Sequence, residues 1–420
     1  MKIYCIGIGG IGLSALARYY VHEGHTVSGS DSSDSELIHT LQKEGIHISI
    51  GTDPLEITDD IDLVVYTVAI SLDNALLVRA RELGLPCMTY PEALGVVTKG
   101  KKTIAVCGTH GKTTTTAMVY YALKACGINP TVIIGSLLSE GGTNYIAGDS
   151  DFMVVEACEY KRSFLALHPI HIVVTNIDED HLDYYKDLSD IHSAFQTFAD
   201  ALPHEGLLVT HSNVSLVTNA RKVDADCISI KDIDLTVLGE HNKSNAQLVI
   251  ALIKELGLDE EKARGGLKQF PGTRRRMEYK GKTGTGVMVY DDYGHHPTEI
   301  KATYEALRTA YPKGEYTIVM LFQPHLYSRT KLLFNDFVKV LSAVDHVYVL
   351  PIYRARLEDT SVTSEEELVS AITAAGGTAD RLESLSDIPE FVESLTDTKT
   401  IVVNMGAGDA FAQLDKVRFV

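Results

Sequence analysis

The segment Thr103–Thr116, TIAVCGTHGKTTTT, decides the fold of this chain. A strand-like apolar run leads into a short glycine loop, and a helix-like segment rich in threonine and alanine follows. Backbone amides of such a loop can surround phosphate oxygens, Lys112 can neutralise phosphate charge, and Thr113 can ligate Mg²⁺. The pattern G-x-x-x-x-G-K-[ST] is not met, because Val106 replaces its first glycine. The sequence therefore predicts a shortened phosphate-binding loop, with ATP contacts from Gly108, Thr109, His110, Gly111, Lys112, Thr113 and Thr114.

A second glycine-rich turn lies at the start of the chain. The strand-like run KIYCIGI merges into GIGGIGLSALA, which satisfies G-x-G-x-x-G with Gly7, Gly9 and Gly12. Asp31 closes the next strand-like segment. Turns of this kind hold a phosphate on helix N-terminal amides, while the acid binds a ribose hydroxyl. NAD, FAD and UDP-sugars all use such a turn, and a turn that only packs helix against strand is the alternative without a ligand.

The composition is that of a globular protein, with 45% hydrophobic and 22% charged residues among 420. A formal net charge of −18 argues against general binding to nucleic acid or to anionic membranes. The six cysteines are scattered without a CxxC pair, which favours buried free thiols in a reducing compartment. Neither a signal peptide nor an apolar run of about eighteen residues is visible, so we expect a cytoplasmic protein.

Short apolar runs alternate with helix-length segments, which predicts α/β layers with largely parallel sheets. Early strands are expected at Ile46–Ile50, at Leu63–Val68 and near Cys87. Breaks are expected at the polar stretch Lys99–Lys102 and at Pro271–Gly272. We therefore expect three domains: an N-terminal Rossmann-like domain at 1–98, a central P-loop ATPase-type domain at 99–272, and a C-terminal Rossmann-like domain at 273–420.

Seven further motifs follow the loop in order. They are EACEYKRSFL (156–165), TNIDEDHLDYY (175–185), LGEHNKSNA (238–246), FPGTRRRME (270–278), DDYGHHPTE (291–299), FQPHLYSRT (322–330) and MGAGD (405–409). Together with the shortened loop they resemble the Mur ligases, the ATP-dependent enzymes that build the peptidoglycan stem peptide, and the resemblance runs from end to end. GIGGIG, DDYGHHPTE and QPH-x-YSRT resemble the branch that adds alanine.

The resemblance implies joining of L-alanine to the lactyl carboxylate of UDP-N-acetylmuramate. A carboxylate oxygen is a poor leaving group, so ATP first converts the carboxylate to an acyl phosphate, which the amine then attacks. Such phosphoryl transfer needs charge neutralisation and alignment. The implied cofactors are ATP and Mg²⁺ or Mn²⁺, and the implied partners are the two small-molecule substrates.

The resemblance also implies roles for individual residues. Catalytic roles are implied for Lys112, His181 and Arg329. Metal ligation is implied for Thr113, Glu156 and His181. UDP-sugar contacts are implied for Gly9, Gly10, Ile11, Asp31 and Glu159. Further ATP contacts are implied for His241, Asn242, Asn245, Arg275 and Asp292, and amino-acid contacts for Tyr293, His325 and Arg329.

Some neighbouring residues leave choices open. The triplet Arg274–Arg276 leaves the register of the nucleotide-binding arginine open by one residue. His295 and His296 precede Pro297, and we interpret them as packing at a helix start rather than as metal ligands. Three acids beside His181 are given no role: Asp178, Asp180 and Asp183.

The chain departs from the family pattern at four places. Cys158 and Lys161 stand where acids are usual, which puts the contacts of that loop with the muramyl group in question. The stretch 190–203 lacks the lysine that many sister ligases carbamylate, in agreement with the alanine-adding branch. Leu326 replaces a frequent arginine, so either Arg329 holds the alanine carboxylate alone, or Arg354 joins Arg329 and supplies the charge missing at position 326.

Three other functions were weighed. A related ligase could add another amino acid or a recycled peptide, although DDYGHHP favours direct addition of alanine. An NAD-dependent oxidoreductase built on GIGGIG would leave Lys112, Glu156 and the LGEHNKSNA motif without a role. A non-catalytic nucleotide-binding scaffold would predict a broken loop or metal site, and the sequence shows neither.

Overall fold

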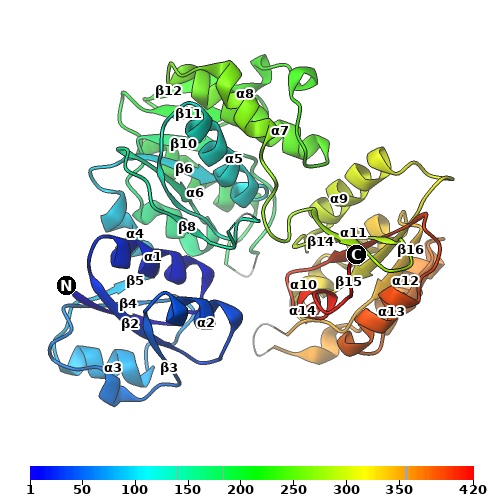
Figure 1. The fold of residues 1–420 in the computed structure, drawn as a ribbon, viewed down its shortest axis with the longest axis horizontal. Coiled ribbons are helices and arrows are strands. Elements are labelled where there is room, and N and C mark those ends of the chain that lie inside the picture. The colour runs from blue at the N-terminus through cyan, green and yellow to red at the C-terminus, as the bar shows by residue number, and fades with distance from the viewer. Residues whose placement is uncertain (140, 183, 355–357) are drawn as a thin grey trace. The chain divides into compact units, whose positions relative to one another are not determined.

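The structure is a computed structural model that describes residues 1–139, 141–182, 184–354 and 358–420. Its strands form three sheets, of five, seven and six strands (Figure 1). One compact unit comprises Met1–Leu235 and Lys243–Pro271, and the other comprises Thr236–Asn242 and Gly272–Val420. The first unit holds two sheets and the second holds one, so the predicted α/β class is confirmed, while the exact domain boundaries stay a prediction.

The first sheet is parallel, in the order β3-β2-β1-β4-β5. Its strands are β1 (Lys2–Ile6), β2 (Thr26–Asp31), β3 (His47–Ile50), β4 (Leu63–Tyr66) and β5 (Cys87–Thr89). Its helices are α1 (Ile11–His22), α2 (Glu36–Lys43), α3 (Ala75–Glu82) and α4 (Tyr90–Thr98). The strand order reverses beside β1, so the first glycine turn lies where sheets of this kind bind ligands.

The second sheet has the order β12-β11-β10-β6-β9-β7-β8 and is parallel except for the β7–β8 pair. Its strands are β6 (Lys102–Cys107), β7 (Thr131–Ile133), β8 (Tyr145–Ile146), β9 (Phe152–Glu156), β10 (His171–Val174), β11 (Leu207–Thr210) and β12 (Arg221–Asp224). The helices are α5 (Lys112–Ala125), α6 (Leu188–Asp200), α7 (Glu240–Glu255) and α8 (Glu260–Lys268). Because β6 pairs with both β9 and β10, the segments that follow these three strands emerge at one edge of the sheet.

The first two sheets share one hydrophobic core, which extends from Ile3 to Leu216 along the chain. Arg18 on α1 is buried and binds both Glu44 and Asn144. Asn144 in turn donates to the carbonyl of Ile11 at 2.6 Å. These contacts join the start of α1 to the residue before β8, so the two sheets pack as one body.

The third sheet has the order β13-β14-β18-β15-β16-β17 and is parallel except for the β13–β14 pair. Its strands are β13 (Glu278–Lys282), β14 (Met288–Asp292), β15 (Thr317–Phe322), β16 (His346–Val349), β17 (Ala379–Arg381) and β18 (Thr400–Met405). The helices are α9 (Pro297–Ala310), α10 (Tyr327–Leu332), α11 (Phe334–Leu341), α12 (Glu365–Ala374), α13 (Ile388–Ser394) and α14 (Ala410–Leu414). Alternate residues of β15 enter two different cores, Met320 on one face and Leu321 on the other, as expected for a sheet covered on both sides.

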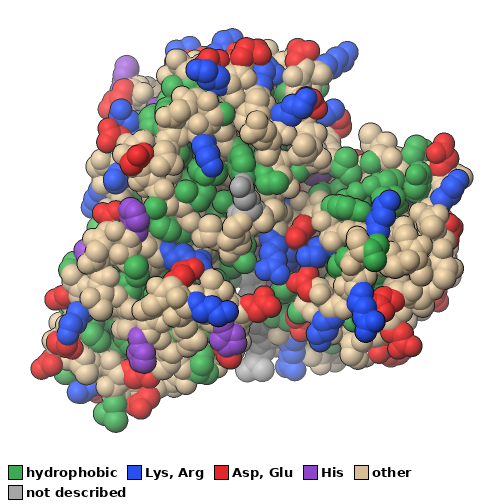
Figure 2. Space-filling view, in the orientation of Figure 1, with side chains coloured by type: hydrophobic (Ala, Val, Ile, Leu, Met, Phe, Trp, Pro, Cys, Tyr) green, Lys and Arg blue, Asp and Glu red, His purple; other side chains and the backbone are tan. Residues whose placement is uncertain are grey.

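In the described ranges, six short 3₁₀ helices connect these elements. They are η1 (Pro54–Glu56), η2 (Tyr160–Ala166), η3 (Ala225–Cys227), η4 (Ile230–Asp232), η5 (Thr360–Val362) and η6 (Leu385–Asp387). None of the helices in the described ranges has the length and apolar character that a bilayer crossing requires. Acidic and basic side chains are both scattered over the face in Figure 2, among hydrophobic and other side chains.

Candidate active site

The phosphate loop lies between β6 and α5, as the sequence predicts. Gly108 has φ +137° and Gly111 has φ +81°, backbone conformations that residues with a Cβ rarely adopt. A Cβ on Gly108 would also come 3.0 Å from the carbonyl oxygen of Asn176. Gly111 is the N-cap of α5, so the first amides of this helix are available for an anion.

The segment after β10 holds the phosphate loop in place. The Thr109 hydroxyl accepts from the amide of Asp178 at 2.9 Å, and the amide of His110 donates to Asn176 Oδ1 at 2.9 Å. Asn176 also donates to the carbonyl of His110 at 3.0 Å. Sequence reasoning assigned no role to Asn176, although it stands in the TNIDEDH motif directly after a strand-like run, and that position was the available signal.

Lys112 begins α5 and turns back over the loop. Its Nζ donates to the carbonyl oxygens of Gly108 at 2.6 Å and Thr109 at 2.9 Å, and to Glu159 Oε1 at 2.9 Å. Burial acts to raise the pKa of Glu159, but the charges of Lys112 and His181 outweigh it, and the pKa lies below its usual value. Burial likewise acts to lower the pKa of Lys112, yet Glu159 holds it above the ordinary value. Both groups are therefore charged, and the lysine is fixed at the loop.

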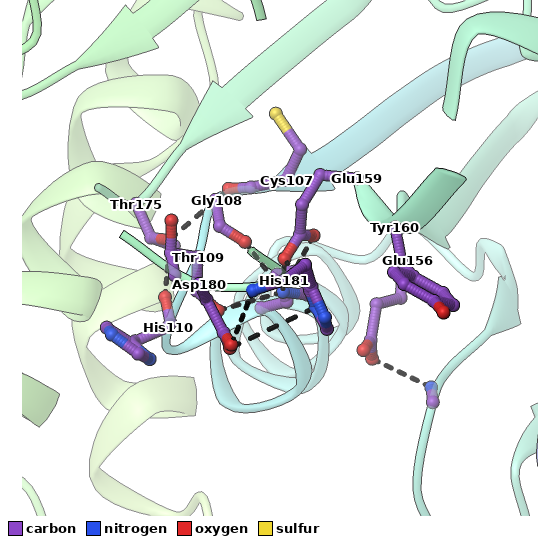
Figure 3. Close-up of polar contacts among 12 residues, drawn as sticks. Cys107, Gly108, Thr109, His110, Glu156, Glu159, Tyr160, Thr175, Asp180 and His181 are labelled. Carbon is purple, nitrogen blue, oxygen red and sulfur yellow. Dashed lines mark hydrogen bonds and ion pairs between the residues drawn. The ribbon is translucent and has the colours of Figure 1, made fainter. Parts of the chain in front are cut away.

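Glu159 also contacts His181 (Figure 3). Its Oε1 lies 3.6 Å from His181 Nε2, and its side chain is only 2% exposed. The imidazole lies against the ring of Tyr160, with centroids 4.7 Å apart. His181 has φ +55°, so the loop bends sharply at this residue. The contacts of Glu159 thus lie at the phosphate loop, whereas the sequence grouped it with the UDP-sugar residues.

Thr113 and Glu156 are two of the three predicted metal ligands, and they contact each other. The Thr113 hydroxyl donates to Glu156 Oε1 at 3.1 Å, and the amide of Gly135 donates to Glu156 Oε2 at 2.7 Å. A hydroxyl and a carboxylate are oxygen donors of the kind that Mg²⁺ prefers, so these two residues fit the predicted ion. His181 instead faces Glu159, so Thr113 and Glu156 contact each other while the third predicted ligand contacts a different acid. Asp183 lies outside the described residues.

The side chain of Asp31 binds the backbone of the first glycine turn. Asp31 Oδ2 accepts from the amide of Gly9 at 2.9 Å, and Gly10 is the N-cap of α1. Ile11 opens the helix, and its carbonyl is held by Asn144. The predicted UDP-sugar residues of this turn are therefore neighbours, with Asp31 bound to the turn itself.

The arginine triplet separates into distinct environments. Arg275 donates to Asp291 at 3.2 Å and to the carbonyl of Gly406 at 2.5 Å, and it lies over the ring of Phe411 at 4.1 Å. Its guanidinium is bound inside the domain, and the contact of Arg275 or Arg276 with the nucleotide stays a prediction. Arg276 has a more exposed side chain, while both guanidinium groups lie over the ring of Tyr293, at 5.1 Å for Arg275 and 4.8 Å for Arg276. We assign the nucleotide role to Arg276 as a proposal.

Asp292 is buried and holds a backbone turn. Its carboxylate accepts from the amides of Met277 and Gly294, both at 2.7 Å. Burial raises the pKa of Asp292 to about 6, against the lowering effect of Arg276. This carboxylate therefore shapes the segment that carries Tyr293 and Arg276.

The LGEHNKSNA residues lie at the start of α7. Burial lowers the pKa of His241, and Asn242 donates to the carbonyl of Leu238 at 2.6 Å. Asn245 lies against the phosphate loop, because a Cβ on Gly111 would come 2.9 Å from its Oδ1. The structure thus brings Asn245 to the loop, as expected for an ATP contact.

Two of the three predicted amino-acid residues, Tyr293 and His325, belong to a row of rings, while Arg329 lies on α10. Tyr293, His295, His325 and Tyr353 follow one another, with successive centroids 5.5, 5.5 and 5.6 Å apart. His295 therefore links Tyr293 to His325. His296 instead caps α9, which opens at Pro297, so the predicted helix start is confirmed.

Leu326 lies between His325 of the ring row and the start of α10 at Tyr327. Leu326 is buried with φ +68°, and its amide donates to the carbonyl of Tyr353 at 2.9 Å. Arg354, next along the chain, donates to the carbonyl of Glu358 at 3.4 Å. The Glu358 carboxylate accepts from the amides of Tyr327 at 2.7 Å and Ser328 at 3.1 Å. Sequence reasoning did not assign Glu358, and no motif marks it.

Comparisons with known proteins identify the family of this chain. Family profiles described as "Mur ligase family, catalytic domain", "Mur ligase middle domain" and "Mur ligase, glutamate ligase domain" match residues 2–102, 106–229 and 275–408. A UDP-N-acetylmuramate–L-alanine ligase from Clostridium acetobutylicum is 40% identical over 98% of this chain and 96% of its own length. The chain belongs to the Mur ligase family.

Solved structures place the Mur ligase fold over the whole chain. The UDP-N-acetylmuramate–alanine ligase of Thermotoga maritima matches this Mur ligase with a TM-score of 0.83 and 29% identity, covering 99% of this chain and 98% of that one. A murein peptide ligase from Psychrobacter arcticus matches with a TM-score of 0.70 and 22% identity, covering 100% of both chains. At the lower identity the likeness shows the shared fold alone.

Proposed function

We propose that this Mur ligase joins L-alanine to the lactyl carboxylate of UDP-N-acetylmuramate in peptidoglycan precursor synthesis, using ATP. One observation carries the proposal: the 40% identity with the L-alanine ligase of C. acetobutylicum spans nearly the whole of both chains. The match therefore includes the segments assigned to the sugar nucleotide and the amino acid as well as the phosphate loop.

The phosphate loop supports the first half of the reaction. Transfer of the γ-phosphoryl group to the lactyl carboxylate gives an acyl phosphate, with ADP as the other product. Lys112 and the amides at the start of α5 would neutralise the charge that spreads over the phosphate oxygens. Because Glu159 and two backbone carbonyls take the three N–H donors of Lys112, the ammonium must exchange at least one of these bonds for a phosphate oxygen when a nucleotide binds.

The second half is attack of the alanine amine on the acyl phosphate, which releases phosphate. His181 would orient that amine, and Glu159 holds the imidazole in place. Thr113, Glu156 and His181 would hold Mg²⁺ or Mn²⁺, which supplies charge neutralisation to the phosphates. The carboxylate of alanine would be bound by Arg329, beside Tyr293 and His325.

The first prediction is a strict requirement for three substrates. Phosphate release should occur only with ATP–Mg²⁺, UDP-N-acetylmuramate and L-alanine together, and it should be measured across a panel of twenty amino acids and a muramyl-type tripeptide.

Lys112→Ala should lower kcat by at least about a hundredfold, because it removes several kcal/mol of transition-state stabilisation.

Lys99→Ala is the matched control, because Lys99 is exposed just before β6, and its turnover should stay normal. Full ATPase activity without the sugar nucleotide, rapid oxidation of NADH, or preference for the tripeptide over alanine would each contradict the proposed function.

A further inference from the structure

A serine, a histidine and an aspartate form a row beside the phosphate loop. His211 follows β11, Asp226 lies in η3 and Ser244 lies on α7. His211 Nδ1 is 2.6 Å from Asp226 Oδ1, and its Nε2 is 2.8 Å from Ser244 Oγ. The imidazole is 11% exposed. None of the roles assigned above uses these three residues, which we call the His211 relay.

The directions of the two hydrogen bonds follow from the charge of Asp226. Hydrogen bonds from Ser212 and His211 lower the pKa of Asp226 to about 2, so this group is a carboxylate. A carboxylate only accepts, and His211 Nδ1 must therefore carry a proton. In the neutral imidazole Nε2 is then an acceptor, and the hydroxyl of Ser244 donates to it. The Ser244 hydroxyl therefore binds His211, which follows β11, rather than a carbonyl oxygen in the preceding turn of α7.

The relay ends one residue before Asn245, which lies against Gly111 of the phosphate loop. The same helix is tied to the η3 side a second time, because Gln247 donates to the carbonyl of Ile228 at 2.7 Å. Over a single turn α7 is rigid, so the bond at Ser244 fixes its rotation about the helix axis. That rotation decides where the Asn245 side chain points.

We propose that His211 is a positioning residue for ATP. The relay Asp226–His211–Ser244 holds α7 in the rotation that keeps Asn245 against the phosphate loop. This rests on the proposed use of ATP at that loop. A row that served folding alone would make the same hydrogen bonds but would leave nucleotide affinity unchanged when it is broken.

Two substitutions break the relay from opposite sides. His211→Asn keeps a donor toward Asp226 but removes the ring nitrogen that faces Ser244, and Ser244→Ala removes the hydroxyl. Each should raise the KM for ATP roughly three- to tenfold, the size expected for one lost hydrogen bond, with kcat and the KM for UDP-N-acetylmuramate little changed. His192→Asn is the matched control, because His192 makes a surface contact with the Ser215 carbonyl at 3.1 Å in the same domain. Its KM for ATP should stay normal.

The deciding measurement is the same substitution in an Asn245→Ala background. If the relay acts through Asn245, His211→Asn should cause no further loss of ATP–Mg²⁺ affinity there, measured by calorimetry on the full chain. Unchanged ATP affinity in both His211→Asn and Ser244→Ala, or a loss that adds fully to that of Asn245→Ala, would overturn the relay. Failure of the unsubstituted chain to bind ATP would instead overturn the proposed function along with it.

Discussion

At the scale of single residues, Glu159 holds two functional side chains at once. The sequence placed it with the sugar nucleotide, since the motif EACEY shows an acid but not the direction of its side chain. Two consecutive left-handed residues, Lys161 with φ +51° and Arg162 with φ +58°, turn the chain just after it. No pattern in the sequence marks non-glycine residues for that conformation, so the ion pair with Lys112 could not be predicted.

The prediction for alanine binding concerns Arg329. If it binds the alanine carboxylate, Arg329→Ala should raise the KM for alanine by roughly tenfold or more, because a charge-assisted hydrogen bond contributes about 1.5–3 kcal/mol. The KM for ATP should stay unchanged. Lys331→Ala is the control, as Lys331 is an exposed cation on the same short helix α10.

Arg354 decides between the two alternatives for Leu326. It follows Tyr353, whose carbonyl binds the Leu326 amide, so it lies close in the fold to the missing arginine. A severalfold rise in the KM for alanine in Arg354→Ala would show that it supplies the second cation, and a normal KM would leave Arg329 alone. A normal alanine KM in Arg329→Ala would mean that this motif does not bind the amino acid.

Glu156 carries the prediction for the metal. Glu156→Gln should raise the Mg²⁺ concentration for half-maximal phosphate release severalfold, because an amide oxygen is a weaker ligand than a carboxylate. The exposed Glu205 provides the control substitution Glu205→Gln. If the Mg²⁺ dependence of Glu156→Gln overlays that of the unsubstituted chain, Glu156 is not a ligand.

At the scale of elements, the turn between β14 and α9 should respond to pH. An aspartate in an unfolded chain has a pKa of about 3.9, whereas burial raises the pKa of Asp292 to about 6. Between these values the folded chain keeps the proton that the unfolded chain has lost. Stability should therefore decrease as pH rises from about 4 to about 6, by about 3 kcal/mol in total.

Asp292→Asn tests this sign, since an amide cannot titrate. The difference in melting temperature between the unsubstituted chain and Asp292→Asn should favour the unsubstituted chain most at about pH 4 and shrink toward about pH 6. A constant difference across that range would show that Asp292 titrates near its ordinary pKa.

Element starts were easier to predict than side-chain directions. Pro297 after a histidine pair predicts a helix start, and α9 begins there with His296 as its cap. The arginine triplet shows the limit, because three identical residues carry no signal of register. Only the burial of Arg275 against Asp291 and Phe411 separates it from Arg276.

At the scale of the whole molecule, alternating strand and helix patterns were sufficient for the α/β class and for the first-domain strands near Ile46–Ile50, Leu63–Val68 and Cys87. The place of the loop between a strand and a helix was predicted, because a strand, two glycines and a lysine fix one local geometry, while the ATP contacts of its residues stay a prediction. The resemblance placed Thr113 and Glu156 at one metal site, and these residues are in contact, but other contacts between distant segments were not predicted. Asn144 with Ile11 and Ser244 with His211 depend on packing across sheets, which local patterns do not encode.

The contact between Arg18 and Asn144 affects the order in which the chain can fold during synthesis. A ribosome adds roughly 5–20 residues each second. Asn144 follows Arg18 by 126 positions, so it is made about 6–25 seconds later. During that interval Arg18 of the nascent α1 can pair with Glu44, but Asn144 and the later side chains of the shared hydrophobic core have not yet been synthesised. The first domain of this Mur ligase therefore matures only when a segment of the second has been translated.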